Sequence, residues 1–187
     1  MANKDAAFGL RPIGKVGQNR DAQGLSEYDI AASASAIYFN DPVEILSTGT
    51  IGVAAATDAL LGSLTGVFFT DATTSKPTFA NHLNASNTAT DIKGFVTDDP
   101  YQRYEIQSDG ATEATDVGQN ADIVYAAGSS PDFVSKVELD ESDHKDATAQ
   151  LRIIGISKDP ENNTAGSANV NLVVIINEHQ LKGTTGV

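Results

Sequence analysis

Short runs of alternating or continuous apolar residues recur along the chain, separated by clusters of Gly, Asn, Asp, Ser and Thr. No long stretch keeps apolar residues at the helical spacing of i, i+3, i+4 and i+7. Alternation bounded by turn-forming residues is typical of strands in all-β proteins. The predicted strands cover residues 26–31, 36–46, 49–56, 64–70, 94–99, 101–107, 121–127, 132–139, 150–156 and 169–178.

Strands without helices need another way to bury their apolar faces. Closure into a barrel, or stacking as a sandwich, leaves the fewest exposed strand edges. We therefore expect an all-β fold: a single β-barrel or sandwich-like domain of about nine or ten short strands, with long loops.

The strongest predicted strand is residues 169–178. One of its faces carries Val170, Leu172, Val174 and Ile176, and the other carries Val173 and Ile175. Apolar residues on both faces are typical of a strand in the centre of a sheet.

Two stretches are predicted to be loops. Residues 71–91 are mostly small and polar, and Phe79 and Leu83 are their large apolar side chains. A loop of this length inside a compact domain is commonly functional or mobile. Residues 140–148 are predicted to form a second, highly charged turn.

The segment AFGLRPIGKVGQNRD, residues 7–21, suits neither a helix nor a long strand, because it contains a proline and three glycines. We expect an extended N-terminal arm over residues 1–25, followed by the β-barrel or sandwich domain over residues 26–187. Such an arm can become ordered on a partner through apolar anchors and basic charges. The alternatives are an N-terminal strand or cap over the end of the barrel, and a disordered terminus.

Charge is distributed unevenly along the 187 residues. The net charge is −13, from 25 acidic and 12 basic residues. Residues 1–20 hold four basic residues and one acidic residue, a net +3, which leaves −16 for the remainder. An acidic body repels phosphate backbones, so we expect no nucleic-acid partner.

Two further absences narrow the class of protein. The chain has no cysteine, which excludes disulfides, thiolate metal sites and cysteine nucleophiles. It contains no run of about 18 apolar residues and no signal-peptide pattern, so we expect no membrane span and no export by that route.

Candidate catalytic chemistry is sparse. His82, His144 and His179 are scattered, without a nucleophile elbow or a phosphate-binding glycine loop. The acidic run 138–146 around His144 could bind a divalent ion, but it lacks the glycine and the spaced carboxylates of a calcium loop. We favour a solvated turn there, and we expect no catalytic residue, no bound metal and no cofactor, hence no enzyme.

Several segments resemble the head decoration, or capsid cement, proteins of tailed bacteriophages. The resemblance begins with MANKDAAFGLRPIG at residues 1–14 and ends with VIINEHQL at residues 174–181. Between them, further similar segments keep their order, at residues 40–46, 98–107, 115–124, 137–142 and 149–162. The resemblance covers most of the chain and is weakest over residues 47–91.

This resemblance implies a β-rich structural protein of the virion, made in the host cytoplasm and bound to the outer surface of an assembled head. Its partners would be the major capsid protein and neighbouring copies of itself, as a homotrimer or alternatively a dimer. The residues expected to contact the capsid or a neighbouring copy are Phe8, Leu10, Arg11, Pro12 and Ile13, with Lys4, Lys15 and Arg20 adding charge complementarity.

Two other functions stay open at this point. One is a neck, tail or fibre-base component of the same virion. The other is a β-fold enzyme or glycan-binding module that uses loop 71–91 with His82 or His144, although the chain has no Trp for a sugar platform.

Overall fold

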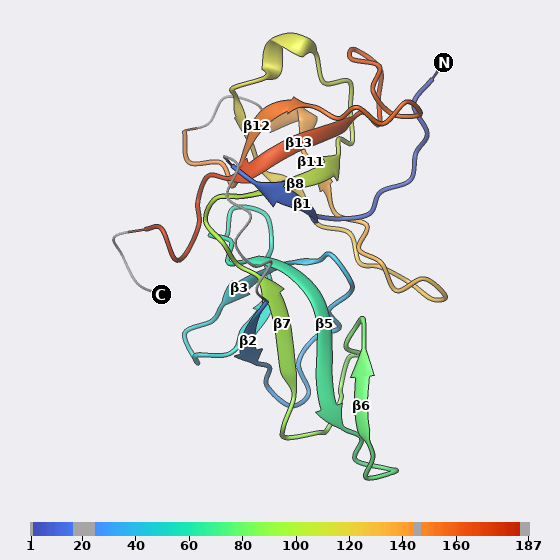
Figure 1. Ribbon diagram of the computed structural model, residues 1–187, viewed down its shortest axis with the longest axis vertical. Helices are drawn as coiled ribbons and strands as arrows, with labels where there is room; N and C mark the ends of the chain where they lie inside the picture. Colours follow the sequence, from blue (N-terminus) through green and yellow to red (C-terminus); the bar gives the residue numbers. More distant parts are fainter. Residues whose placement is uncertain (1, 17–24, 144–146, 184–187) are drawn as a thin grey trace.

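The computed structural model describes residues 2–16, 25–143 and 147–183, and within them the chain forms thirteen short strands and two 3-10 turns. The strands build antiparallel sheets, and the described residues contain no α-helix (Figure 1). The prediction of an all-β fold is therefore confirmed, with more and shorter strands than the sequence pattern separates.

The first sheet has five strands, in the order β1-β8-β13-β12-β9. Strand β13 lies in the middle of this order, as its apolar residues on both faces predict. The bounds are β1 Arg11–Lys15, β8 Gln102–Gln107, β9 Asn120–Ala121, β12 Leu151–Ile156 and β13 Asn171–Ile176. A separate two-stranded ladder joins β10 (Ile123–Val124) to β11 (Glu138–Leu139).

The second sheet has the order β2-β7-β5-β3-β4, and β6 pairs with the C-terminal half of β5. Figure 1 shows the two sheets at opposite ends of the long axis. The bounds are β2 Ser26–Asp29, β3 Pro42–Ile45, β4 Ile51–Val53, β5 Gly62–Thr70, β6 Pro77–Ala80 and β7 Lys93–Thr97. The two 3-10 turns are η1 (Ala114–Asp116) and η2 (Glu141–Asp143).

Each sheet has its own hydrophobic core. The first core gathers around Tyr104 and Leu172, and the second around Leu64 and Val96. Residues outside the strands complete both cores; these include Leu10, Leu60 and Val137 in the first and Ile37, Leu83 and Ala89 in the second.

Neither sheet closes into a barrel within the described residues, because each strand order ends in edge strands. Of the two expected arrangements, barrel closure is therefore absent from this part of the chain. The physical reason is that loops and the N-terminal segment cover the apolar faces, so the strands need not curl round to bury themselves.

Two strands come from stretches that the sequence pattern does not mark clearly. Strand β6 lies inside the predicted loop 71–91 and follows β5 in register from Val67↔Ala80 to Thr70↔Pro77. Strand β1 lies in the segment that was expected to be an arm, and it pairs with β8. Each of these short strands forms backbone hydrogen bonds with a longer neighbour, β8 for β1 and β5 for β6. The neighbour stabilises a strand that its own polar or glycine-rich sequence does not favour.

Residues 38–41 lead into β3 of the second sheet and contact both the N-terminal segment and the second sheet. The Leu10 amide donates to the Asn40 carbonyl (2.9 Å), and the Asn40 amide donates to the Leu64 carbonyl (2.9 Å). Asp41 is fully buried, and its carboxylate accepts a hydrogen bond from the Tyr38 amide (2.7 Å). Burial raises the pKa of Asp41 to about 6, against the opposing effect of a hydrogen bond from Ser135.

This pKa makes stability depend on pH in a defined direction. The folded pKa is about 6 and the ordinary value is 3.8, so the folded state binds the Asp41 proton more tightly than the unfolded state. The contribution of Asp41 is therefore most favourable below about pH 4 and is lost as the pH rises to about 6. A shift of this size corresponds to about 3 kcal/mol.

We predict that Asp41→Asn removes the loss of stability that the native protein shows as the pH rises from 4 to 6. The free energy of unfolding of the variant, relative to the native protein, should rise between pH 4 and pH 6 and stay constant at higher pH, measured by urea denaturation. Asp132→Asn, at an exposed position, is the matched control and should show no such rise. A difference for Asp41→Asn that does not change over this range would contradict the assignment.

Candidate functional site

The N-terminal segment, residues 2–16, lies along the first sheet of its own chain. Strand β1 pairs with β8 from Arg11↔Glu105 to Lys15↔Gln102, with a shift of register between Pro12 and Gly14. The segment is extended, as expected, but it is ordered by contacts within the subunit.

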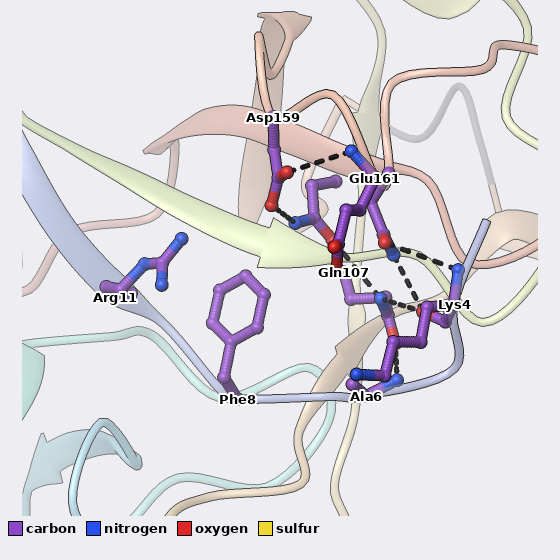
Figure 2. Close-up of a pocket in the computed structure, with 9 residues that line it drawn as sticks. Lys4, Ala6, Phe8, Arg11, Gln107, Asp159 and Glu161 are labelled. Atoms are coloured by element: carbon purple, nitrogen blue, oxygen red, sulfur yellow. Dashed lines mark hydrogen bonds between the residues drawn. The ribbon is translucent and has the colours of Figure 1, made fainter.

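Two buried amide side chains hold the main chain ahead of β1. The Gln107 side chain accepts a hydrogen bond from the Ala6 amide (2.8 Å) and donates one to the Lys4 carbonyl (3.0 Å). Asn162 donates to the same carbonyl (2.7 Å) and accepts from the Lys4 amide (3.3 Å). Figure 2 shows the Gln107 side chain joined directly to Lys4 and Ala6 by these hydrogen bonds. These bonds replace the strand pairing that the segment lacks before Arg11.

Asn3 fixes the segment closer to its start. Its side-chain amide donates to the carbonyls of Thr164 (3.1 Å) and Ala168 (3.0 Å), and its side-chain oxygen accepts from the Thr164 amide (3.2 Å). The loop that precedes β13 thus holds the N-terminal segment at a position well before β1.

Gly9 and Leu10 explain the unusual composition of the segment. Gly9 has φ of +74°, and a Cβ built there would lie 2.3 Å from the Ser135 Cβ and 2.5 Å from the Asn40 carbonyl oxygen. Only glycine fits that space and that backbone conformation. The turn directs Leu10, which is fully buried, into the first core.

A cavity of about 180 Å³ lies between this segment and the loop after β12. Figure 2 shows Arg11 beside the Phe8 ring at one end of it; the Arg11 guanidinium lies 4.4 Å from the ring centroid. Arg11 also forms an ion pair with Glu105, and Glu105 accepts a hydrogen bond from Ser157. The opposite wall includes Asp159 and Glu161.

Most residues that line this cavity carry polar or charged side chains. Asp159 accepts hydrogen bonds from the Asn171 side chain (3.4 Å) and the Glu161 amide (3.0 Å). The N-terminal segment forms the facing wall and brings the apolar side chains of Ala6 and Phe8 to it.

The structure distributes the eight predicted contact residues between core and surface. Leu10 belongs to the first core and has no exposed surface for a partner. Phe8, Pro12 and Lys15 are half-buried, and Lys15 pairs with Asp99 (2.5 Å). The exposed members are Lys4, Arg11 and Ile13. Arg20 lies outside the described residues.

Three exposed residues that the sequence analysis did not single out extend this surface. Val16 (49% exposed) donates its amide to the Tyr101 carbonyl (2.8 Å), and Tyr101 is 58% exposed. The Lys182 ammonium lies 5.0 Å from the Tyr101 ring centroid, next to Leu181, which is 51% exposed. Ile13 of β1 (46% exposed) lies three residues before Val16, and we call these four exposed apolar residues the β1 patch: Ile13, Val16, Tyr101 and Leu181.

Leu181 and Tyr101 had a signal in the sequence, since both lie in segments that resemble cement proteins (174–181 and 98–107), but neither was marked as exposed, and Val16 had no such signal. Neither Val16 nor Tyr101 lies in an apolar run that distinguishes it from a core residue. Pairing of β1 with β8 brings Val16 and Tyr101 together.

The rest of the VIINEHQL segment connects the two sheets. The Leu60 amide donates to the Glu178 carbonyl (2.8 Å), and the Gln180 side chain bonds the amide (2.6 Å) and carbonyl (3.1 Å) of Ile45. His179 is buried between them, and its burial lowers its pKa. These residues serve the packing of the fold.

The other candidate residues lie elsewhere. The His82 ring stacks on Phe133 with centroids 3.8 Å apart, and burial lowers its pKa. In the acidic turn, Asp140 accepts a hydrogen bond from the Ser142 amide (2.9 Å), and His144 and Asp146 lie outside the described residues. Within the described ranges, no group of three or more His, Asp or Glu side chains could hold a metal ion.

In the same part of the chain, no helix has the length and apolar character needed to cross a membrane. Comparisons of the sequence with protein-family models and with curated proteins, and a comparison with solved structures, found no match.

We predict that Gly9→Ala destabilises the protein far more than Gly49→Ala. Both glycines have positive φ, but no described atom lies within 4 Å of a Cβ built at Gly49. Gly49→Ala, the control, should therefore lower the free energy of unfolding by about 1 kcal/mol, the cost of the backbone conformation alone. Gly9→Ala adds a steric clash and should lower it by at least about 3 kcal/mol. Urea denaturation measures both, and equal losses would contradict the packing around Gly9.

We also predict that Asn162→Ala loosens the N-terminal segment. The variant removes two hydrogen bonds to Lys4, so the amides of residues 2–10 should exchange with solvent at least about tenfold faster, measured by hydrogen exchange. Asn163→Ala, at the exposed neighbouring position, is the control and should leave exchange unchanged. Equal protection in the two variants would show that Asn162 does not hold the segment.

Proposed function

We propose that the protein is a capsid cement protein of a tailed bacteriophage, which binds the outer surface of an assembled head and stabilises contacts between major capsid subunits. The observation that carries this proposal is the β1 patch. It places four exposed apolar side chains next to Lys15 and Lys182 on a chain whose net charge is −13. Clustered exposed apolar side chains commonly mark a protein-binding site.

The way the patch is built supports a binding role. Buried amides and the Gly9–Leu10 turn fix the residues that lead into β1, so Ile13 and Val16 need little ordering when a partner binds. A preorganised surface loses less entropy on association and therefore binds more tightly for its area.

Charge supports the outer surface of the head as the location. An acidic body is repelled by packaged DNA and favours the side of the shell that faces solvent. The proposal includes no nucleic-acid partner, no membrane, no cofactor and no catalysed reaction, with synthesis in the host cytoplasm. Many copies on one lattice stabilise it strongly even where each contact is weak.

The resemblance of residues 1–14 and 174–181 to cement proteins gives the proposal its family. Both segments border the patch, since Ile13 lies in the first and Leu181 in the second. The proposed contact residues on the chain are therefore Ile13, Val16, Tyr101 and Leu181, with two exposed basic groups on the same N-terminal segment: Arg11 next to Ile13, and Lys4 at the cavity farther from the patch.

The test compares one double variant and one single variant with the native protein for binding to expanded, undecorated heads. Deletion of the N-terminal segment is unsuitable because it removes Leu10 from the core. We expect Val16→Ser with Tyr101→Ser to weaken binding at least about tenfold, measured by co-sedimentation with the heads. Phe79→Ser, which changes an exposed aromatic residue outside the patch, is the control and should bind each site as tightly as the native protein.

Native-like binding by the double variant would overturn the role of the β1 patch. The copy number in purified particles tests the function itself, by quantitative gel analysis. A cement protein is present in numbers comparable to the capsid subunits, whereas a few copies per particle would indicate a neck, tail or fibre-base component.

A further inference from the structure

The hairpin of β5 and β6 projects from the end of the second sheet that lies farthest from the first sheet (Figure 1). Its turn is well ordered: the Asp71 carboxylate accepts hydrogen bonds from the amides of Thr73 (3.0 Å) and Thr74 (2.7 Å), and the Asp71 amide donates to the Lys76 carbonyl (3.0 Å). Part of the predicted loop 71–91 is therefore a rigid hairpin.

One face of this hairpin is aromatic and points away from the core. Phe68 lies opposite Phe79 in the ladder, and residues opposite each other in an antiparallel pair share a face. Phe79 is 70% exposed, and its ring stacks on Phe95 of β7 with centroids 5.3 Å apart. Gly66 lies opposite Phe95, and without a side chain it leaves room for the Phe79 ring to reach across β5.

None of these rings belongs to either hydrophobic core, whereas the adjacent Phe69 and Ala80 pack against the second core. We call Phe68, Phe79 and Phe95 the phenylalanine face. Phe79 is its exposed member, and the half-buried rings of Phe68 and Phe95 lie beside it on the solvent side of the sheet.

The outer edge of β6 pairs with no strand within the described residues. Other edges carry features that prevent pairing: β2 has Glu27 and Asp29, which bind Lys93, and β1 has Pro12 and a shift in register. β6 begins with Pro77, which has no amide to donate at that end, but Thr78, Phe79 and Ala80 carry no charge along the rest of its edge. An uncharged edge beside an exposed aromatic ring favours association with another strand.

Charge indicates which partner fits this surface. Residues 59–90 contain one acidic residue, Asp71, and one basic residue, Lys76, so their net charge is zero in a chain whose net charge is −13. Two copies of such a chain repel each other over most of their surfaces. The hairpin itself adds no net charge, and the charged residues beside it on the same face, Glu27, Asp29 and Lys93, are joined in ion pairs, so repulsion between copies is weaker here than over the acidic remainder.

We propose that two copies of this chain associate through the phenylalanine face and the outer edge of β6. The two β6 strands run antiparallel about a two-fold axis, which extends the second sheet from one copy into the next, and the Phe79 rings pack against each other. This pairing goes beyond the proposed function and does not depend on it. It assigns self-association and capsid binding to different surfaces of the molecule.

The test is sedimentation velocity over a wide concentration range. We expect the native protein to be in monomer–dimer equilibrium, Phe79→Ser to weaken dimerisation at least about tenfold, and Phe79→Asp to weaken it further because it adds repulsion across the axis. Salt should strengthen the native dimer, because screening reduces repulsion between the acidic bodies. Tyr101→Ser is the matched control and should dimerise like the native protein.

A native protein that stays monomeric at every concentration and salt would overturn the proposal, as would a Phe79→Ser dimer of native strength or an assembly of three copies. Loss of head binding by Phe79→Ser with unchanged self-association would also overturn it, since the partner of this face would then be the capsid. The two proposals can also fail separately. If the double variant in the β1 patch binds heads like the native protein while Phe79 variants dimerise less, only the proposed function is contradicted.

Discussion

The hydrogen bonds of Asn40 hold the three parts of this molecule together. Its carbonyl accepts from Leu10, its side chain donates to the Phe8 carbonyl (3.2 Å), and its amide donates to Leu64 in the second sheet. The N-terminal segment, the loop that leads into β3 and the second core therefore meet at one residue. Because Leu10 is anchored there, β1 can continue onto β8 and present its outer edge to solvent.

The segments that resemble cement proteins contain residues with structural roles. Asn3, Gly9 and Leu10 fix the N-terminal segment, and Glu178 and Gln180 join the first sheet to the second. Such residues preserve an architecture. In the proposed function, recognition depends on the exposed side chains beside them.

Two surfaces with low negative charge stand out on a strongly acidic chain. The β1 patch combines apolar groups with Lys15 and Lys182, and the β5–β6 hairpin that carries Phe68 and Phe79 has no net charge. In both proposals, repulsion between acidic surfaces disfavours other modes of association. The distribution of charge would then contribute to specificity alongside the apolar groups.

The sequence by itself determined the all-β class and the central position of β13, because alternation and apolar character on both faces are local properties of a strand. It also marked the segment that contains Gly9 and Leu10 as unsuited to a helix or a long strand. It did not predict that both residues are buried. Only the tertiary structure decided that β1 and β6 form, since both are short strands stabilised by the neighbours β8 and β5. It also brought Val16, Tyr101 and Leu181 together, because contacts between residues far apart in the chain depend on how the sheets pair, which no local pattern encodes.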